Sequence, residues 1–201
     1  IYDVSTYVTI SNCKLNMPNM TSKDSPNAYV VLGKGDSYWL FSPANAAEHC
    51  TITKNTTSGP INGGPYYAVF LSDSYGNTDN KFNTIHDNEL KDFFQYGIKT
   101  LWCDEGTKIT NNTIHNTGHT NDVAATFGID IYQPSSVGGF NISNNKIYNL
   151  RNGGKETSCY GIRYQTKSAK SSSKALIANN IIEMKPLKDC YGIFTYCQYD
   201  A

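Results

Sequence analysis

Hydrophobic and polar residues alternate over several short segments of this chain, and these segments recur at a nearly constant interval. One kind starts with an aromatic residue, usually followed by Gly and Ile, and its copies begin at Tyr67, Tyr96, Phe127, Tyr160 and Tyr191. Successive copies are 29, 31, 33 and 31 residues apart. Alternation with a period of two is typical of β-strands, whereas a helix needs apolar residues three and four apart. The pattern therefore predicts an all-β repeat protein.

A second kind of segment lies between the aromatic ones and carries Asn at a fixed place, as in "KITNNTI" (108–114) and "NISNNKI" (141–147). Alignment on the first Ile places five Asn residues in one column: Asn55, Asn88, Asn112, Asn145 and Asn180. Asn tolerates the left-handed backbone conformation of a tight bend, and its amide can bond to equivalent amides above and below. We therefore expect a bend in every repeat and an Asn ladder along the stack.

Each repeat is predicted to contain the aromatic strand, a loop, a second strand, the Asn bend and a short third strand. Repeats of this kind can stack by parallel pairing at a spacing of about 4.8 Å. The prediction is one domain over 1–201, a single-stranded right-handed parallel β-helix of about five to six coils. Because the pattern includes no helix to cap either end, we expect an excerpt of a longer chain, or a protomer whose ends are covered by partners.

The repeat φ-x-φ-x-N-N-x-φ, where φ is apolar, resembles the parallel β-helix repeats of the pectin-lyase-like superfamily. The resemblance implies that the Asn bend joins the second and third strands. The aromatic strands would then form the first sheet, on which members of that family build a groove for polysaccharides. The same fold also serves phage tailspikes and adhesins, so the resemblance leaves three functions open: a carbohydrate-active enzyme, a non-catalytic glycan binder and a trimeric tailspike-like protomer.

Simple alternation along the aromatic strands predicts which side chains face outward. On this pattern Tyr96, Ile98 and Thr100 point into the core, while the glycines and two variable columns point outward. The variable columns supply aromatic platforms for sugar rings and charged groups for uronates, as a sugar chain requires. The candidate charged residues are Lys99, Asp130 and Arg163, and the candidate substrate-binding residues are Phe70, Tyr132, Gln165, Phe194 and Tyr196.

Three interpretations of the charged column compete. A polysaccharide lyase needs a cation to neutralise a uronate and a base to remove the adjacent proton, and Lys99 and Arg163 could take these roles. A glycoside hydrolase needs two carboxylates, for which Asp130 with Asp104 or Glu105 is the nearest pair. Without catalysis, the column is an alternating-charge ladder that keeps like charges apart.

Composition narrows the choice of partners. The chain has 17 basic and 17 acidic residues in 201, and this balance argues against an electrostatic nucleic-acid binder. The sequence contains no apolar run long enough for a membrane span, so membrane insertion is not expected. We expect an extracellular or cell-surface protein that binds polysaccharide as a monomer or homotrimer. No cofactor is predicted, although calcium binding through Asp73, Asp79 and Asp87 stays open.

The remaining reactive residues point to structure or to loops. Cys159 and Cys190 each precede an aromatic strand and should be neighbours on adjacent coils, either as thiols or as a disulfide. The spacing of the six cysteines includes no C-x-x-C, which argues against a zinc site. His86 and His115 lie at the Asn bend and are interpreted as structural. We interpret His119 and Asp122 as residues of a solvated loop. We interpret the "NTD" at 77–79 as a chance match.

Overall fold

The computed structural model describes most of the strands and bends of the chain. The described residues are 5–20, 28–33, 47–60, 63–72, 81–101, 106–118, 125–132, 139–150, 158–166, 174–184 and 189–197. These ranges contain strands and no helix, and accordingly none of them includes a helix able to cross a membrane.

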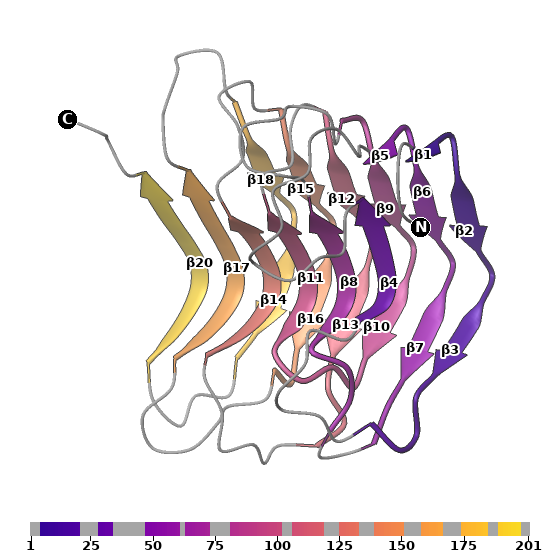
Figure 1. Cartoon of the computed structure of the whole chain (residues 1–201). Helices are drawn as coiled ribbons and strands as arrows, with labels where there is room; N and C mark the ends of the chain where they lie inside the picture. The colour runs from indigo at the N-terminus through magenta and orange to yellow at the C-terminus, as the bar shows by residue number, and fades with distance from the viewer. Residues whose placement is uncertain are drawn as a thin grey trace, which may run out of the picture.

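Three parallel sheets of six strands form the body of the protein, and each coil adds one strand to each sheet (Figure 1). Sheet 1 contains the long strands β4 (Ala28–Gly33), β8 (Tyr67–Ser72), β11 (Tyr96–Leu101), β14 (Thr126–Tyr132), β17 (Cys159–Thr166) and β20 (Cys190–Cys197). Sheet 2 contains β2 (Thr9–Ser11), β6 (Thr51–Thr53), β9 (Thr84–His86), β12 (Lys108–Thr110), β15 (Asn141–Ser143) and β18 (Leu176–Ala178). Sheet 3 contains β3 (Lys14–Asn16), β7 (Thr56–Ser58), β10 (Glu89–Lys91), β13 (Thr113–His115), β16 (Lys146–Tyr148) and β19 (Ile181–Glu183). A separate short pair joins β1 (Ser5–Thr6) to β5 (Ala47–Glu48).

This arrangement confirms the predicted parallel β-helix solenoid. Every strand of sheets 1 to 3 pairs with the equivalent strand one coil away, so sequence neighbours never pair within a sheet. The aromatic, second and third strands of each predicted repeat fall in sheets 1, 2 and 3 in that order. The sequence pattern missed one strand of sheet 1. This strand, β4, begins at Ala28, which pairs with Tyr67 but is not aromatic.

The core lies between the three sheets and consists of stacked aliphatic side chains. Ile85 and Ile109 from sheet 2 and Ile114 from sheet 3 are fully buried there, together with Ile98 and Ile129 from sheet 1. Each occupies the same position in its coil as the residue above it, because the parallel register aligns equivalent positions. Burying one such side chain contributes roughly 1.5–3 kcal/mol, so the repeated Ile columns account for much of the stability of the stack.

The aromatic residue at the start of each sheet 1 strand does not point inward, and that part of the sequence prediction is wrong. Tyr67 and Tyr96 pack with Phe70, Leu101 and Tyr132 in a separate cluster on the outer face, apart from the core. The glycine that follows is the residue that faces the core. A Cβ on Gly97 would lie 2.5 Å from Ile114 Cγ2, an atom of the core.

Alternation fails at this point because two consecutive residues, Gly97 and Ile98, both face inward. The register is the same on both sides of the glycine, since Tyr96 pairs with Phe127 and Ile98 with Ile129. A side chain at position 97 would also meet Gly128 O at 2.5 Å, so only Gly fits the close approach of adjacent coils here. The outer face therefore carries the aromatic column in place of the expected side-chain-free glycine strip.

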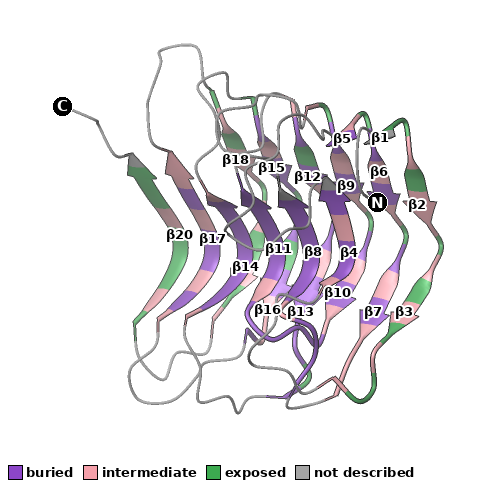
Figure 2. Ribbon diagram, viewed as in Figure 1, coloured by how far each residue is buried: buried purple, intermediate pink, exposed green. Residues whose placement is uncertain are grey.

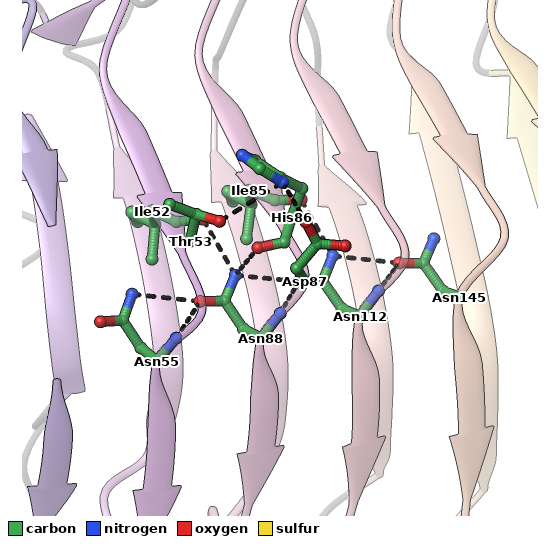
Figure 3. Close-up of polar contacts among 9 residues, drawn as sticks. All are labelled: Ile52, Thr53, Asn55, Ile85, His86, Asp87, Asn88, Asn112 and Asn145. Carbon is green, nitrogen blue, oxygen red and sulfur yellow. Dashed lines mark hydrogen bonds and ion pairs between the residues drawn. The ribbon is translucent and has the colours of Figure 1, made fainter. Parts of the chain in front are cut away.

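The predicted Asn ladder is present at the bend between sheets 2 and 3 (Figure 3). Asn88 Nδ2 donates to Asn112 Oδ1 at 2.9 Å, and Asn112 Nδ2 donates to Asn145 Oδ1 at 3.0 Å. The same side-chain oxygens also accept backbone N–H bonds, as from Asn88 N to Asn112 Oδ1 at 3.1 Å. Each amide further donates to a carbonyl of the preceding coil, as Asn112 does to Ile85 O at 2.9 Å. Hydrogen bonds thus connect every coil from Asn55 to Asn180.

The left-handed backbone conformation belongs to the residue before each ladder Asn and not to the ladder Asn itself. Positive φ angles occur at Lys54 (55°), Asp87 (57°), Asn111 (57°), Asn144 (57°) and Asn179 (54°). The bend thus separates two tasks. The first residue turns the chain and faces solvent, whereas the second supplies the buried amide that joins the coils.

Candidate functional site

The outer face of sheet 1 brings the sequence-predicted site residues together in parallel columns. One column is the aromatic ladder of Tyr67, Tyr96, Phe127, Tyr160 and Tyr191. The next is the charged column of Phe70, Lys99, Asp130, Arg163 and Phe194, whose members pair in register. The third contains Leu101, Tyr132, Gln165 and Tyr196. All three columns face outward because each strand regains its alternation after the glycine.

The centre of the charged column is an ion-paired triad. Arg163 Nε donates to Asp130 Oδ1 at 2.7 Å, and Arg163 Nη2 donates to Asp130 Oδ2 at 2.8 Å. Lys99 Nζ donates to Asp130 Oδ2 from the opposite side. One carboxylate thus holds two cations, and the triad carries a net charge of +1.

Aromatic rings surround the two cations. The Lys99 ammonium lies 4.5 Å from the centroid of the Tyr132 ring and 5.1 Å from that of Tyr96. The Arg163 guanidinium lies 4.1 Å from the centroid of Phe127. Such cation–π contacts stabilise a desolvated cation by up to about 2 kcal/mol, so the rings offset part of the cost of removing these charges from water.

Burial of the triad decides its electrostatics. Asp130 is 0 % exposed and Lys99 is 7 % exposed. Desolvation lowers the pKa of Lys99 below its usual 10.5, against the attraction of Asp130. Desolvation also lowers the pKa of Arg163, but its hydrogen bonds and attraction to Asp130 outweigh this and raise it. Burial, followed by the Asp130 charge, raises the pKa of Tyr96, so this phenol stays protonated beside the triad.

The aromatic ladder is the part of this face that sequence reasoning assigned to the core. Ring centroids of successive members lie 5.2, 4.8, 4.9 and 5.0 Å apart, from Tyr67 to Tyr191, and all four contacts are stacked. The signal that could have identified the outward direction is the small residue after the aromatic, which is Ala68 in one copy and Gly in the other four. A glycine that close packing requires marks the inward position, and the aromatic before it then faces outward.

Exposure divides the outer face into two halves (Figure 2). Over β8, β11 and β14 it is mostly buried, including Phe70 and Leu101. Over β17 and β20 it opens: Gln165 and Phe194 are partly exposed, Tyr191 is 39 % exposed and Tyr196 is 47 % exposed. β20 is an end strand of sheet 1, and its Ile193, which pairs with the core residue Ile162, is likewise open at 53 % exposed.

No family model matches this chain, and no curated protein or solved structure matches it. The assignment as a parallel β-helix therefore rests on the strand pairing and the Asn ladder. Membership of the pectin-lyase-like superfamily stays a prediction.

The other candidate residues are either structural or outside the described residues. His86 contacts Thr53 Oγ1 at 3.3 Å and Asp87 Oδ2 at 2.7 Å on the bend, and the ring of His115 stacks on Tyr148 with centroids 4.7 Å apart. Within the described ranges no three His, Cys, Asp or Glu side chains gather as metal ligands. The candidate residues that lie outside the described ranges are Asp73, Asp79, Asp104, Glu105, His119, Asp122 and the segment 77–79.

Proposed function

We propose that this β-helix binds an extended acidic polysaccharide on the outer face of β17 and β20, without cleaving it. The observation that supports the proposal is the exposure of Tyr191, Phe194 and Tyr196 beside the partly exposed Gln165. Aromatic rings offer flat apolar surfaces to the faces of sugar rings, and the Gln165 amide can both donate and accept hydrogen bonds to hydroxyls.

The repeating geometry suits a repeating ligand. Parallel stacking places equivalent side chains at intervals of about 4.8 Å along the solenoid. A polymer that lies along this axis would therefore meet similar groups at regular intervals. This favours an extended chain over a compact small molecule.

The charge of the triad favours an anionic polymer. Lys99 and Arg163 together carry two positive charges against the single negative charge of Asp130, and Arg163 is partly exposed with its side chain at 19 %. The bonds to Asp130 use Nε and Nη2 of Arg163, and neither uses Nη1. A uronate carboxylate is an acceptor of the right charge.

Binding is favoured over cleavage because the groups that would carry the chemistry are engaged with one another. A lyase base must reach a substrate proton, but Lys99 is 7 % exposed and donates to Asp130. A hydrolase carboxylate must reach the glycosidic oxygen or the anomeric carbon, but Asp130 is 0 % exposed and accepts from two cations. An extracellular or cell-surface location would place the protein where such polymers occur.

Affinity electrophoresis in gels containing polygalacturonate tests the proposal, with dextran gels as the neutral comparison. The wild type is expected to be retarded by polygalacturonate, with retardation falling as salt is raised. Tyr196→Ala should weaken binding about tenfold, which corresponds to about 1.4 kcal/mol. Tyr7→Ala is the matched control, since Tyr7 is 74 % exposed but lies beside β1 and β5, away from sheet 1.

Incubation with polygalacturonate, followed by assays for reducing ends and for unsaturated uronate products, separates binding from cleavage. We expect neither product. Release of either product would overturn the non-catalytic proposal. Equal retardation of the Tyr196→Ala and Tyr7→Ala variants, or no retardation of the wild type, would reject this face as the binding site. Light scattering on the same samples distinguishes the predicted monomer from the homotrimer.

A further inference from the structure

Two cysteines occupy one inward-facing column at the start of sheet 1 strands. Cys159 begins β17, Cys190 begins β20, and the two are direct partners in the parallel register. Cys159 is 3 % exposed and belongs to the core, and Cys190 is partly buried against the same core. Adjacent parallel strands bring paired Cα atoms to about 4.8 Å, within the range that a disulfide can span.

The two side chains already contact each other as thiols. Each thiol lies close enough to the other to affect its ionisation, and the backbone bond from Cys159 N to Asp189 O at 3.0 Å holds the two strand ends together. The other two cysteines with described side chains differ. The thiol of Cys13 donates to Ser11 O at 3.3 Å and that of Cys50 to Glu48 O at 3.4 Å, each within its own coil.

We propose that Cys159 and Cys190 form a dithiol site that small disulfides, such as glutathione disulfide, oxidise to a disulfide between the last two coils. This site lies on the inner side of sheet 1, and the inference does not depend on polysaccharide binding.

The steps follow from the different exposure of the two sulfurs. The Cys190 thiol loses its proton and attacks one sulfur of glutathione disulfide, which gives a mixed disulfide and releases one glutathione thiol. The Cys159 thiol then loses its proton and attacks the Cys190 sulfur, which forms the Cys159–Cys190 bond and releases the second glutathione thiol. Two protein thiols are oxidised and one disulfide is reduced.

The order of attack is fixed by access and by ionisation. Cys190 is partly exposed and can meet the reagent, whereas Cys159 is buried. Burial raises the pKa of both thiols above the usual 9.0, but interaction between them raises that of Cys159 further and opposes the rise for Cys190, so Cys159 is the poorer first nucleophile. Once Cys190 carries the mixed disulfide, its sulfur lies next to Cys159. This proximity compensates for the low thiolate fraction of Cys159.

The experiment is oxidation of the folded protein by glutathione disulfide, in a background with Cys103→Ser and Cys197→Ser. Mass spectrometry of tryptic digests should detect peptides 156–163 and 189–201 joined by a disulfide, with two of the four remaining thiols lost. The Cys159→Ser variant should stop at a glutathione adduct on Cys190. The Cys190→Ser variant should leave Cys159 unmodified, and Cys13→Ser should behave like the background.

Two results would overturn the proposal. One is a background protein that retains all four thiols or keeps a stable glutathione adduct without the joined peptides. The other is a Cys190→Ser variant in which Cys159 acquires glutathione as fast as Cys190 does in the Cys159→Ser variant. Because serine is close in size to cysteine, both variants are expected to fold, and circular dichroism before oxidation verifies this.

Discussion

Replacing Asp130 by Asn removes the one anion from the triad while keeping the shape of the side chain. Lys99 and Arg163 then remain largely buried without a counter-charge, and Arg163 loses one of its two acceptors. Breaking a buried ion pair by removing one partner costs about 3–5 kcal/mol. We expect Asp130→Asn to lower the free energy of unfolding by this amount, measured by urea denaturation at neutral pH.

The loss should depend on pH with a defined sign. Burial already lowers the folded-state pKa of Lys99, and removal of Asp130 takes away the attraction that opposes this. Between that lowered pKa and the unfolded value of about 10.4, the unfolded chain binds a proton that the folded protein lacks. The stability of the variant should therefore rise with pH through this window. The deficit relative to the wild type is largest at neutral pH and shrinks toward pH 10.

A charge-free variant provides the control. In Lys99→Met/Asp130→Leu/Arg163→Met no ion is left buried, and apolar replacement of buried ion pairs is often neutral or stabilising. This variant should regain at least half of the loss seen in Asp130→Asn. The reasoning is refuted if Asp130→Asn costs less than about 1 kcal/mol, or if the charge-free variant is no more stable than Asp130→Asn.

Two further predictions concern the joints between coils. Asn112→Ala should cost about 2–4 kcal/mol in urea denaturation, because it leaves the buried Asn88 N–H without its acceptor and removes the amide bonds to Ile85 O and Asn145 Oδ1. Asn111→Ala should cost only about 1 kcal/mol for its positive φ; equal losses would contradict the division of tasks at the bend. Gly128→Ala should destabilise the protein by several kcal/mol, since its Cβ would lie 2.6 Å from Gly161 O, while Gly192→Ala should be nearly neutral because nothing lies within 4 Å. Thermal denaturation of Gly128→Ala and Gly192→Ala measures this difference. Similar melting temperatures would show that the close approach of adjacent coils does not require Gly.

The sequence predicted the coil and the ladder well because both depend on local chemistry that repeats. An Asn at the same point of five successive repeats indicates a side chain that bonds to its own copies, and Asn112 does this. The inward direction of Tyr96 was predicted wrongly because alternation assumes a uniform pleat. Alternation fails at Gly97, where Gly128 O of the neighbouring coil leaves no room for a side chain.

The charged column was only partly predictable. Its stacking order, Lys99 to Asp130 to Arg163, follows from the repeat and is present in the register. The burial of Asp130 depends on packing between segments far apart in the chain, and no periodicity encodes it. Whether these side chains touch a ligand stays a prediction, which the binding and product assays address.

The glycine column also limits how coils can be exchanged. Gly97, Gly128 and Gly161 each face an Ile of sheet 3, whereas the same position in β8 is the buried Ala68 and in β4 is Tyr29. By the same register, the equivalent sheet 3 residue is Leu90 for Ala68 and Thr57 for Tyr29. A larger side chain in sheet 1 is thus matched by a smaller side chain in sheet 3. A coil moved from the middle of the stack to its beginning would place a side chain of the wrong size in the core. The coils are therefore similar in sequence but not interchangeable.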